Sequence, residues 1–441
     1  MTRNKLNIWL FIAFGLMVVW ALGGIVLLDR NAVPATSEAK TPDSIKVLIR
    51  TGTEAAALRQ LLEPFERSTG IHADLIEVGR DGYFTTVGTQ LLAGSDTFDL
   101  VFVPNTSVAE LASAGAIAPL DPFIDNPALT DRKAFDLPDF LAVYRYNGTI
   151  YALPTDISTH FLYYRSDLIP NPPETWDEVY ELAEKFSQSR DPASPTKWGL
   201  AMPAVVPEER TKIFASLLWT FGGDFISDSD GHALLGKPES LQAAQFMQKL
   251  LRNKLIPGDL LYWDFAKTRD ALLSGDVAMA APFWNAAYPA ILSDKESRYA
   301  GNIKIALLPG MKDEQGHIRR APFQHGWTFA VNASSKHPEW AWKFLSYATG
   351  KQGGALYVKA GGVPARRSIL SDPAYAASRP DFRLILKSME VAREEPSVTY
   401  YPSMVEITEK ALAKIYTLES SPEEAFREAS NDLNRLTAAN P

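Results

Sequence analysis

The chain has 441 residues, which is too long for one compact core and suits two or three domains. Its formal net charge of -8 argues against nucleic acid as a partner, because binding to phosphates needs a basic face. The chain has no cysteine, so disulfides, thiol catalysis, thiolate metal sites and lipid attachment at a cysteine are excluded.

An uncharged apolar run, Ile8–Leu28, follows a few basic residues at the N-terminus. As a helix it would be about 31 Å long, at about 1.5 Å per residue, which is enough to cross a bilayer. The basic residues precede the run, so the rest of the chain is expected outside the cytoplasm. We predict a signal or anchor helix over residues 1–30 and a linker over 31–43. The helix either stays as an anchor, which we favour, or is removed by cleavage after Ala35 or Ala39.

The next part of the chain alternates strands and helices. Ile45–Arg50 alternates apolar and basic residues, which predicts a strand, and Thr53 can cap the helix that follows. Ile71–Val78 is the next predicted strand, and the apolar run Phe98–Val103 is typical of a strand buried on both faces. This order predicts a βαβ unit in a parallel sheet. Because ligands gather at the carboxyl ends of such strands, the candidate contacts here are Glu54, Tyr83 and Asn105.

The stretch after Tyr146 predicts a passage between two lobes. Asn147-Gly148 favours a hairpin turn, since both residues tolerate positive φ, and Pro154 interrupts the strand that follows. A second strand-like run covers Phe161–Tyr164. We interpret this pattern as a hinge, where a ligand held between lobes would lie. The polar residues at the predicted hinge are Asp156, Ser158 and His160.

Two candidate tryptophans lie in the following helix-rich part of the chain. The amphipathic run Lys212–Phe221 predicts a helix with Trp219 in its last turn. The short apolar run Val277–Ala280 predicts a buried strand, and Trp284 and Asn285 follow it closely. From residue type alone, Trp284 is expected in the core.

Two later segments predict a return between the lobes and a third crossing. Phe323–Val331 contains Trp327, whose alternative role is packing within a strand. Gly361–Arg367 contains Arg366, whose alternative role is that of a surface arginine. Three crossings predict a two-lobed clamp that opens by hinge motion.

Several motifs occur in an order that resembles a known family. They are Phe-Asp-Leu-Val at 98–101, Ala-Gly-Ala-Ile-Ala-Pro-Leu-Asp at 114–121 and Pro-Glu-Thr-Trp-Asp-Glu at 173–178, in which Thr175 caps a helix with Glu178 at the capping-box position. The chain resembles the extracytoplasmic solute-binding proteins of ABC importers, in the family that mostly binds carbohydrates. This resemblance covers nearly everything after the linker.

The resemblance implies an α/β, two-lobed periplasmic-binding-protein fold with three inter-lobe crossings, preceded by the hydrophobic helix. The expected N-terminal lobe comprises residues 44–154 plus 325–362. The expected C-terminal lobe comprises 157–322 plus 366–441. The protein would bind a sugar or sugar-like polar solute between the lobes, as a monomer, and deliver it to ABC permease subunits in the membrane. Its own membrane contact would be through residues 8–28.

The resemblance also implies roles for particular side chains. Trp219, Trp284 and Trp327 would stack on apolar faces of the sugar, and Glu54, Asp156 and Arg366 would bond its hydroxyls. The secondary candidates are Tyr83, Asn105, Ser158 and Asn285. No catalytic residue or cofactor is implied, and the six histidines do not show metal-ligand spacing.

Other function classes stay open at this point. A glycoside hydrolase needs two carboxylates about 5–10 Å apart, which Glu54 and Asp156 could supply. A solute sensor or adhesion module with the same fold would have a kinase or surface partner in place of a permease. A phosphate loop over Gly231–Lys237 is disfavoured, because Pro238 stands where a Ser or Thr is needed.

Overall fold

The computed structural model describes residues 44–205, 209–375 and 377–440. The predicted N-terminal helix and linker, residues 1–43, lie outside the described residues. Within the described ranges no helix combines the length and the apolar character that crossing a membrane requires.

The first sheet has six strands in the order β2-β1-β3-β13-β5-β4. β1 pairs in parallel with β2 and β3, which confirms the predicted βαβ unit, and β13 inserts antiparallel between β3 and β5. Asn147 and Gly148 have positive φ, so the predicted hairpin turn joins β4 to β5. The strands are β1 Ile45–Arg50, β2 Ala73–Val78, β3 Leu100–Pro104, β4 Tyr144–Tyr146, β5 Thr149–Pro154 and β13 Trp327–Val331.

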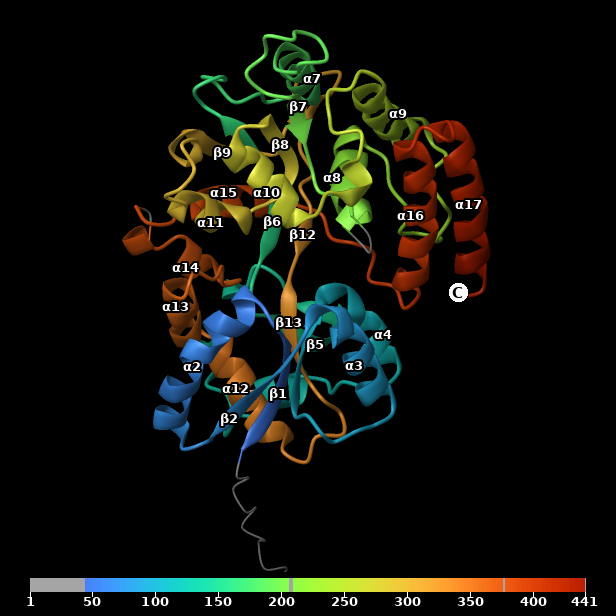
Figure 1. Ribbon diagram of the computed structural model, residues 1–441. Coiled ribbons are helices and arrows are strands. Elements are labelled where there is room, and N and C mark those ends of the chain that lie inside the picture. The colour runs from blue at the N-terminus through green and yellow to red at the C-terminus, as the bar shows by residue number, and fades with distance from the viewer. Residues whose placement is uncertain (1–43, 206–208, 376, 441) are drawn as a thin grey trace, which may run out of the picture. The chain divides into compact units, whose positions relative to one another are not determined.

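Helices pack on both faces of this sheet: α2, α12 and α13 on one side and α3 and α4 on the other (Figure 1). Apolar residues at helical spacing turn one face of α2 to the core, for example Leu58, Leu61 and Phe65. The helices are α2 Thr53–Thr69, α3 Arg80–Leu92, α4 Val108–Ser113, α5 Asp121–Ile124, α6 Arg132–Phe135, α12 Pro338–Ala348, α13 Lys351–Lys359 and α14 Arg367–Leu370.

The second sheet has five strands, in which β12, β6, β8 and β7 follow one another and β9 also pairs with β6. All eight residues of β8 are buried, as expected for a strand covered on both faces. A separate hairpin is formed by β10 Met311–Lys312 and β11 Ile318–Arg319. The strands of the sheet are β6 Ser158–Arg165, β7 Trp198–Ala201, β8 Val277–Trp284, β9 Ile303–Leu307 and β12 Gln324–His325.

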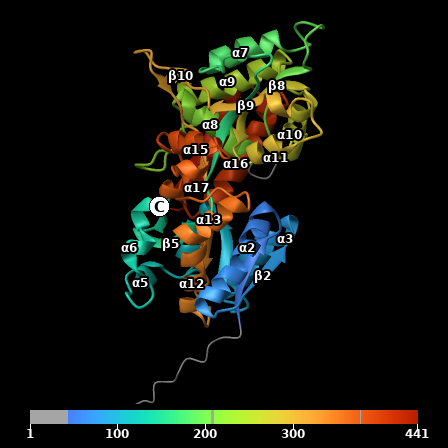
Figure 2. The same ribbon diagram turned by 90° about the vertical axis from the view of Figure 1, so that its left-hand side faces the viewer.

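A second set of helices surrounds this sheet, separate from the set on the first sheet (Figure 2). Thr175 caps α7 as predicted, since its hydroxyl accepts a hydrogen bond from the Glu178 amide. The helices are α7 Trp176–Lys185, α8 Glu209–Phe221, α9 Pro238–Arg252, α10 Phe265–Ser274, α11 Ala287–Ser293, α15 Asp381–Met389, α16 Tyr401–Tyr416 and α17 Pro422–Ala438.

Two predicted details are wrong. Thr53 is the first residue of α2 rather than its cap, because Gly52 occupies the N-cap position without a side-chain bond. The buried strand predicted over Val277–Ala280 continues to Trp284, so this tryptophan ends a strand rather than following one. The strand continues past Ala280 because Pro282, which has no amide hydrogen, lies at a bulge, where Ala281 and Pro282 together oppose the single residue Leu162 of β6.

The chain passes between the two sheets at Pro154–Ser158 and again at His325–Trp327. The two passages lie side by side, because the Thr155 amide donates to the Trp327 carbonyl over 2.8 Å. A third segment also reaches the first passage, since the Ile157 amide donates to the Val363 carbonyl over 3.0 Å. The fold therefore brings residues that are distant in sequence to one place between the sheets.

Candidate functional site

Asp156 lies at the centre of the two passages. Its Oδ1 accepts a hydrogen bond of 2.9 Å from the backbone amide of Trp327, and its side chain is buried. Burial and the nearby carboxylate of Glu54 raise the pKa of Asp156 to about 7, while the Trp327 amide and the charge of Arg50 act in the opposite direction. The carboxyl group is thus poised to exchange a proton near neutral pH.

Trp327 is surrounded by protein groups. Phe102 stacks on it with a centroid separation of 4.9 Å and an interplanar angle of 8°. The guanidinium of Arg50 lies over the ring at 4.0 Å and also bonds Oε1 of Glu54 over 2.7 Å. Trp327 is only 8% exposed. Phe102 and Arg50 therefore cover most of the Trp327 ring in this structure.

Phe84 is a neighbour of Trp327 that no pattern in the sequence indicates. Its ring centroid lies 6.1 Å from that of Trp327, and its side chain is 48% exposed. The predicted Tyr83 beside it is fully buried and donates its hydroxyl to the carbonyls of Phe102 and Leu48. Because α3 begins at Arg80, the two adjacent aromatic side chains point in different directions. The helix start was the signal that could have distinguished them.

Trp284 reaches the same region from the second sheet. Its Nε1 donates to Oε2 of Glu209 over 2.8 Å. Its ring lies 4.1 Å from the ring of His160 and 6.0 Å from the ring of His325. The side chain is 8% exposed. Trp284 and Trp327 are thus connected through His325, which lies 6.1 Å from Trp327.

His325 and His160 differ in how their nitrogens are used. Nδ1 of His160 lies 2.8 Å from the Ser216 hydroxyl. Nδ1 of His325 has no hydrogen-bond partner among the described residues. Burial, together with the charge of Lys212, lowers the pKa of both rings well below the usual range. No local sequence pattern indicates His325, because only the pairing of β12 with β6 places it between the two tryptophans.

Trp219, Asn285 and Arg366 are buried and closely packed among other protein groups. Trp219 stacks on Phe323 and donates Nε1 to Asp224 over 2.9 Å. Oδ1 of Asn285 accepts from the Thr159 amide, and its side chain is 1% exposed. These placements favour structural roles in place of the predicted contacts with solute.

Arg366 is the most completely enclosed of the predicted contacts. Its Nε donates to the Thr349 carbonyl and its Nη1 to the Phe135 carbonyl, both over 2.8 Å. The guanidinium also lies over the ring of Phe140 at 3.5 Å. Burial lowers its pKa to about 10. Arg366 therefore ties together three segments that pack around the first sheet.

Asn105 and Ser158 both contact the second passage between the sheets. Oδ1 of Asn105 accepts from the Gly326 amide over 3.3 Å, and Ser158 pairs with His325 in the ladder between β6 and β12. A small pocket of about 90 Å³ next to Asn105 is also lined by Tyr144 and Glu394. Burial raises the pKa of Glu394 to about 7.

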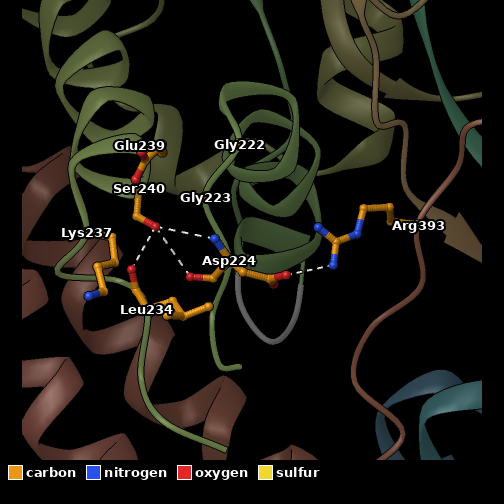
Figure 3. A pocket seen from close by; sticks show the side chains of 8 residues that line it. All are labelled: Gly222, Gly223, Asp224, Leu234, Lys237, Glu239, Ser240 and Arg393. Atoms are coloured by element: carbon orange, nitrogen blue, oxygen red, sulfur yellow. Dashed lines mark hydrogen bonds and ion pairs between the residues drawn. The ribbon is translucent and has the colours of Figure 1, made fainter. Parts of the chain in front are cut away.

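A larger pocket, of about 260 Å³, lies apart from this region between α8 and α9 (Figure 3). Asp224 lies at the wall of this pocket. Its carboxylate accepts a hydrogen bond from Arg393, and its backbone amide donates to the Ser240 hydroxyl. Lys237 also lines it, at the end of the run that formally resembles a phosphate loop. This pocket is built from the second sheet's helices and the segment that carries Arg393, and it does not include the hinge residues.

Residues 60–380 match the family model described as bacterial extracellular solute-binding protein. The chain belongs to this family. It is 26% identical over 400 residues to a probable ABC transporter-binding protein of Deinococcus radiodurans, with 84% of this chain and 92% of the relative covered. It is 23% identical over 371 residues to the erythritol/L-threitol-binding protein of Mycolicibacterium smegmatis, with 78% and 74% covered.

Solved structures of solute-binding proteins have the same fold. Maltose-bound MalE3 of T. maritima aligns with a TM-score of 0.77 and 25% identity, covering 89% of this chain and 99% of the other. An ABC transporter solute-binding protein of Agrobacterium radiobacter K84, in complex with ribitol, aligns with a TM-score of 0.76 and 21% identity, covering 89% and 98%. The two sheets are therefore the two lobes of a periplasmic-binding-protein fold.

These comparisons confirm the predicted family and an extracytoplasmic solute-binding role in ABC transport. The family description is one of binding, so the hydrolase alternative gains no support from it. The side-chain cluster formed by Arg50, Glu54, Asp156, Trp284, His325 and Trp327 lies where the lobes are joined. We call it the hinge cluster.

Proposed function

We propose that the protein captures a neutral sugar or polyol at the hinge cluster and delivers it to the permease of an ABC importer. The observation that supports this most directly is the continuous row of rings Trp284, His325 and Trp327 between the two lobes. Aromatic rings offer apolar surface to the C–H faces of a sugar, while neighbouring polar groups bond its hydroxyls. Phe84 adds a half-exposed ring beside the cluster.

The charges of the cluster favour a neutral solute. Arg50 is paired with Glu54 over 2.7 Å, and the pKa of Asp156 is raised to about 7, so its negative charge is partly removed at neutral pH. A solute with a full charge needs an opposite charge that is not already compensated by the protein. The relatives also fit a polyol or sugar, since their names include erythritol and their structures include ribitol and maltose.

The proposal includes the following organisation. The N-terminal lobe comprises residues 44–154 plus 325–362, the C-terminal lobe comprises 157–322 plus 366–441, and three crossings join them. The helix over residues 8–28 holds a monomer at the outer face of the membrane. We retain Glu54, Asp156, Trp284 and Trp327 as solute contacts from the residues predicted earlier. Asn105 and Ser158 act through the hinge.

A panel of solutes tests the proposal on the full-length protein, purified in a detergent without a sugar headgroup. A solute that binds only the folded form raises stability by about 2.7 kcal/mol at a hundredfold excess over Kd. We expect a thermal shift with at least one of erythritol, ribitol, D-mannitol and maltose, without product formation. A shift with amino acids alone would replace the proposal, since one relative from Sinorhizobium fredii is named as a probable amino-acid ABC transporter periplasmic-binding protein.

The sensor alternative is tested separately from solute identity. Reconstituting the protein with permease and ATPase subunits in vesicles measures uptake of the solute that the panel identifies. Uptake that depends on this protein supports delivery. Binding without any uptake, together with capture of a kinase, would support a sensor instead.

A further inference from the structure

Buried polar atoms without a hydrogen-bond partner gather near the two passages between the lobes. Among the described residues they include Nε of Arg50, Oγ1 of Thr159, Nε2 of His160 and Nδ1 of His325. A buried polar group that is left unsatisfied destabilises the folded protein, because it has lost its hydrogen bonds to water without gaining others. A concentration of such groups at one place is typical of a site whose partner comes from outside the chain.

His325 occupies the central position among these groups. It ends β12 opposite Ser158 of β6, directly before the chain passes to the first sheet. Its ring lies 6.0 Å from that of Trp284 and 6.1 Å from that of Trp327, and the side chain is only 6% exposed. A solute that touches both tryptophans must therefore come close to this imidazole.

The surroundings of His325 select its protonation state. Burial is the main reason why the pKa of His325 is well below the usual range, and the positive charges of Lys212 and Arg50 lower this pKa further. A neutral imidazole has one donor nitrogen and one acceptor nitrogen. A hydroxyl group also donates and accepts, whereas a carboxylate or phosphate group only accepts. The ring is thus matched to hydroxyl groups better than to anions.

We propose that His325 is a specificity-determining residue whose imidazole exchanges a hydrogen bond with a hydroxyl of a neutral polyol or sugar held beside Trp284 and Trp327. The inference rests on the proposed function and names the group that reads the solute at that site. The ring acts by direct contact, because it lies between the two tryptophans at the junction of the lobes.

The test compares His325→Phe, His325→Gln and the wild type as full-length proteins in a detergent without a sugar headgroup. The probes are erythritol, ribitol, D-mannitol and maltose, and calorimetry gives Kd. Phe keeps the ring packing but removes both polar nitrogens, and we expect it to weaken binding at least about tenfold. Gln keeps one donor and one acceptor and should recover part of the affinity. His317→Phe, on the exposed β10–β11 turn, is the matched control and should bind like the wild type.

Each outcome decides between the two proposals. If the wild type binds none of the four probes, the proposed function fails and the role of His325 fails with it. If the wild type binds a probe and His325→Phe binds it equally well, only the inference on His325 is overturned. A loss of affinity in His325→Gln as large as that in His325→Phe would also overturn the inference, because altered packing alone would then explain both losses.

A measurement on the unchanged protein covers the case in which neither variant folds. Imidazole nitrogen resonances of the wild type can be followed by NMR during titration with the bound probe, and the His325 signals are assigned by elimination from variants at the other histidines, such as His317→Phe. We expect the His325 nitrogens to shift and the exposed His317 nitrogens to stay unchanged. Unchanged His325 resonances at saturation would overturn the inference.

Discussion

The molecule holds two tryptophans in nearly the same kind of setting, one in each lobe. In the first lobe, Trp327 stacks on Phe102 at 4.9 Å, and Arg50 lies over its ring at 4.0 Å. Arg50 is in turn paired with the carboxylate of Glu54 over 2.7 Å. The tryptophan ring thus contacts a phenylalanine and an arginine, and the arginine is paired with a carboxylate. We call this the first tryptophan set.

The second lobe has a corresponding arrangement around Trp219. This ring stacks on Phe323 at 5.6 Å with an interplanar angle of 13°, and Arg393 lies over it at 5.1 Å. Arg393 is paired with Asp224 over 2.6 Å. We call this the second tryptophan set. In residue types and stacking geometry it repeats the first one.

The two sets differ in whether their polar groups are satisfied within the protein. Asp224 accepts both the indole Nε1–H of Trp219 and the guanidinium of Arg393, so its carboxylate is fully used. In the first set, Nε of Arg50 has no partner in the part of the chain that the structure describes, and the buried Asp156 lies close by with its pKa raised to about 7. The difference teaches that similar packing can leave polar groups satisfied in one lobe and unsatisfied in the other, and the proposed binding role of the first set depends on the second case.

The largest expected change with pH concerns the buried carboxyl group beside the first set. The folded-state pKa of Asp156 is about 7 against an ordinary value of 3.8, so between these pH values the folded form binds more protons than the unfolded form. The contribution of this group to the free energy of unfolding is therefore complete below pH 4 and is lost as the pH rises to 7. At 1.36 kcal/mol per pKa unit the loss is up to about 4 kcal/mol. Asp156→Asn should remove this pH dependence in denaturant unfolding and be more stable than the wild type at pH 8.

The corresponding substitution in the second tryptophan set should change stability in the opposite direction. Asp224→Asn breaks the ion pair with Arg393, so we expect lower stability than the wild type at neutral and alkaline pH. If Asp156→Asn also lost stability at pH 8, Asp156 would be a satisfied structural carboxylate, and the contrast between the sets would disappear.

A smaller effect is expected from removing each arginine in turn. The side chains of Arg50 and Glu54 are 11% and 16% exposed, so Arg50→Met leaves two carboxyl groups without their cation and should cost about 3 kcal/mol of unfolding free energy. The side chain of Arg393 is 40% exposed, and Arg393→Met should cost at most about 1 kcal/mol. Urea unfolding of both variants measures this. Equal losses would show that solvent screens both pairs alike.

The elements of the fold could be predicted from the sequence because their signals are local. The alternation in Ile45–Arg50 gave a strand with those bounds, and Asn147-Gly148 gave a turn with positive φ. The capping of α7 by Thr175 depends on residues three positions apart. Such signals are complete within a few residues, so no knowledge of the tertiary structure was needed.

The candidate site was only partly predictable, because its chemistry depends on contacts between distant segments. Arg366 resembles a solute contact by position, yet carbonyls of Thr349 and Phe135 enclose it. His325 has no distinguishing local pattern, and its importance arises from the pairing of β12 with β6. Trp219 and Trp284 could not be separated either, since Trp219 lies within a predicted apolar helix face and Trp284 follows a predicted apolar strand. Only packing shows which of the two lies next to the hinge.

Removing these two tryptophans should separate binding from packing. Trp284→Ala and Trp219→Ala remove the same volume from buried positions, and each should destabilise the protein by about 3–5 kcal/mol. Only Trp284 belongs to the hinge cluster, so only its variant should lose affinity for the solute, at least about tenfold or 1.4 kcal/mol. Calorimetry at a temperature where both variants remain folded gives the comparison. A tenfold loss in the Trp219 variant alone would move the site towards the second set.

The smallest expected effect concerns the half-exposed ring beside the first set. Phe84 lies 6.1 Å from Trp327, and a ring contact with a sugar face is worth about 0.5–1.5 kcal/mol. Phe84→Ala should therefore weaken affinity a few-fold while changing stability little, because the side chain is 48% exposed. Leu92→Ala, on the same helix and 56% exposed, is the matched control and should leave affinity unchanged. Equal affinities of both variants would limit solute contact to the buried side of Trp327, where Arg50 already covers the ring, and would leave His325 and Trp284 as the groups that must supply the binding energy.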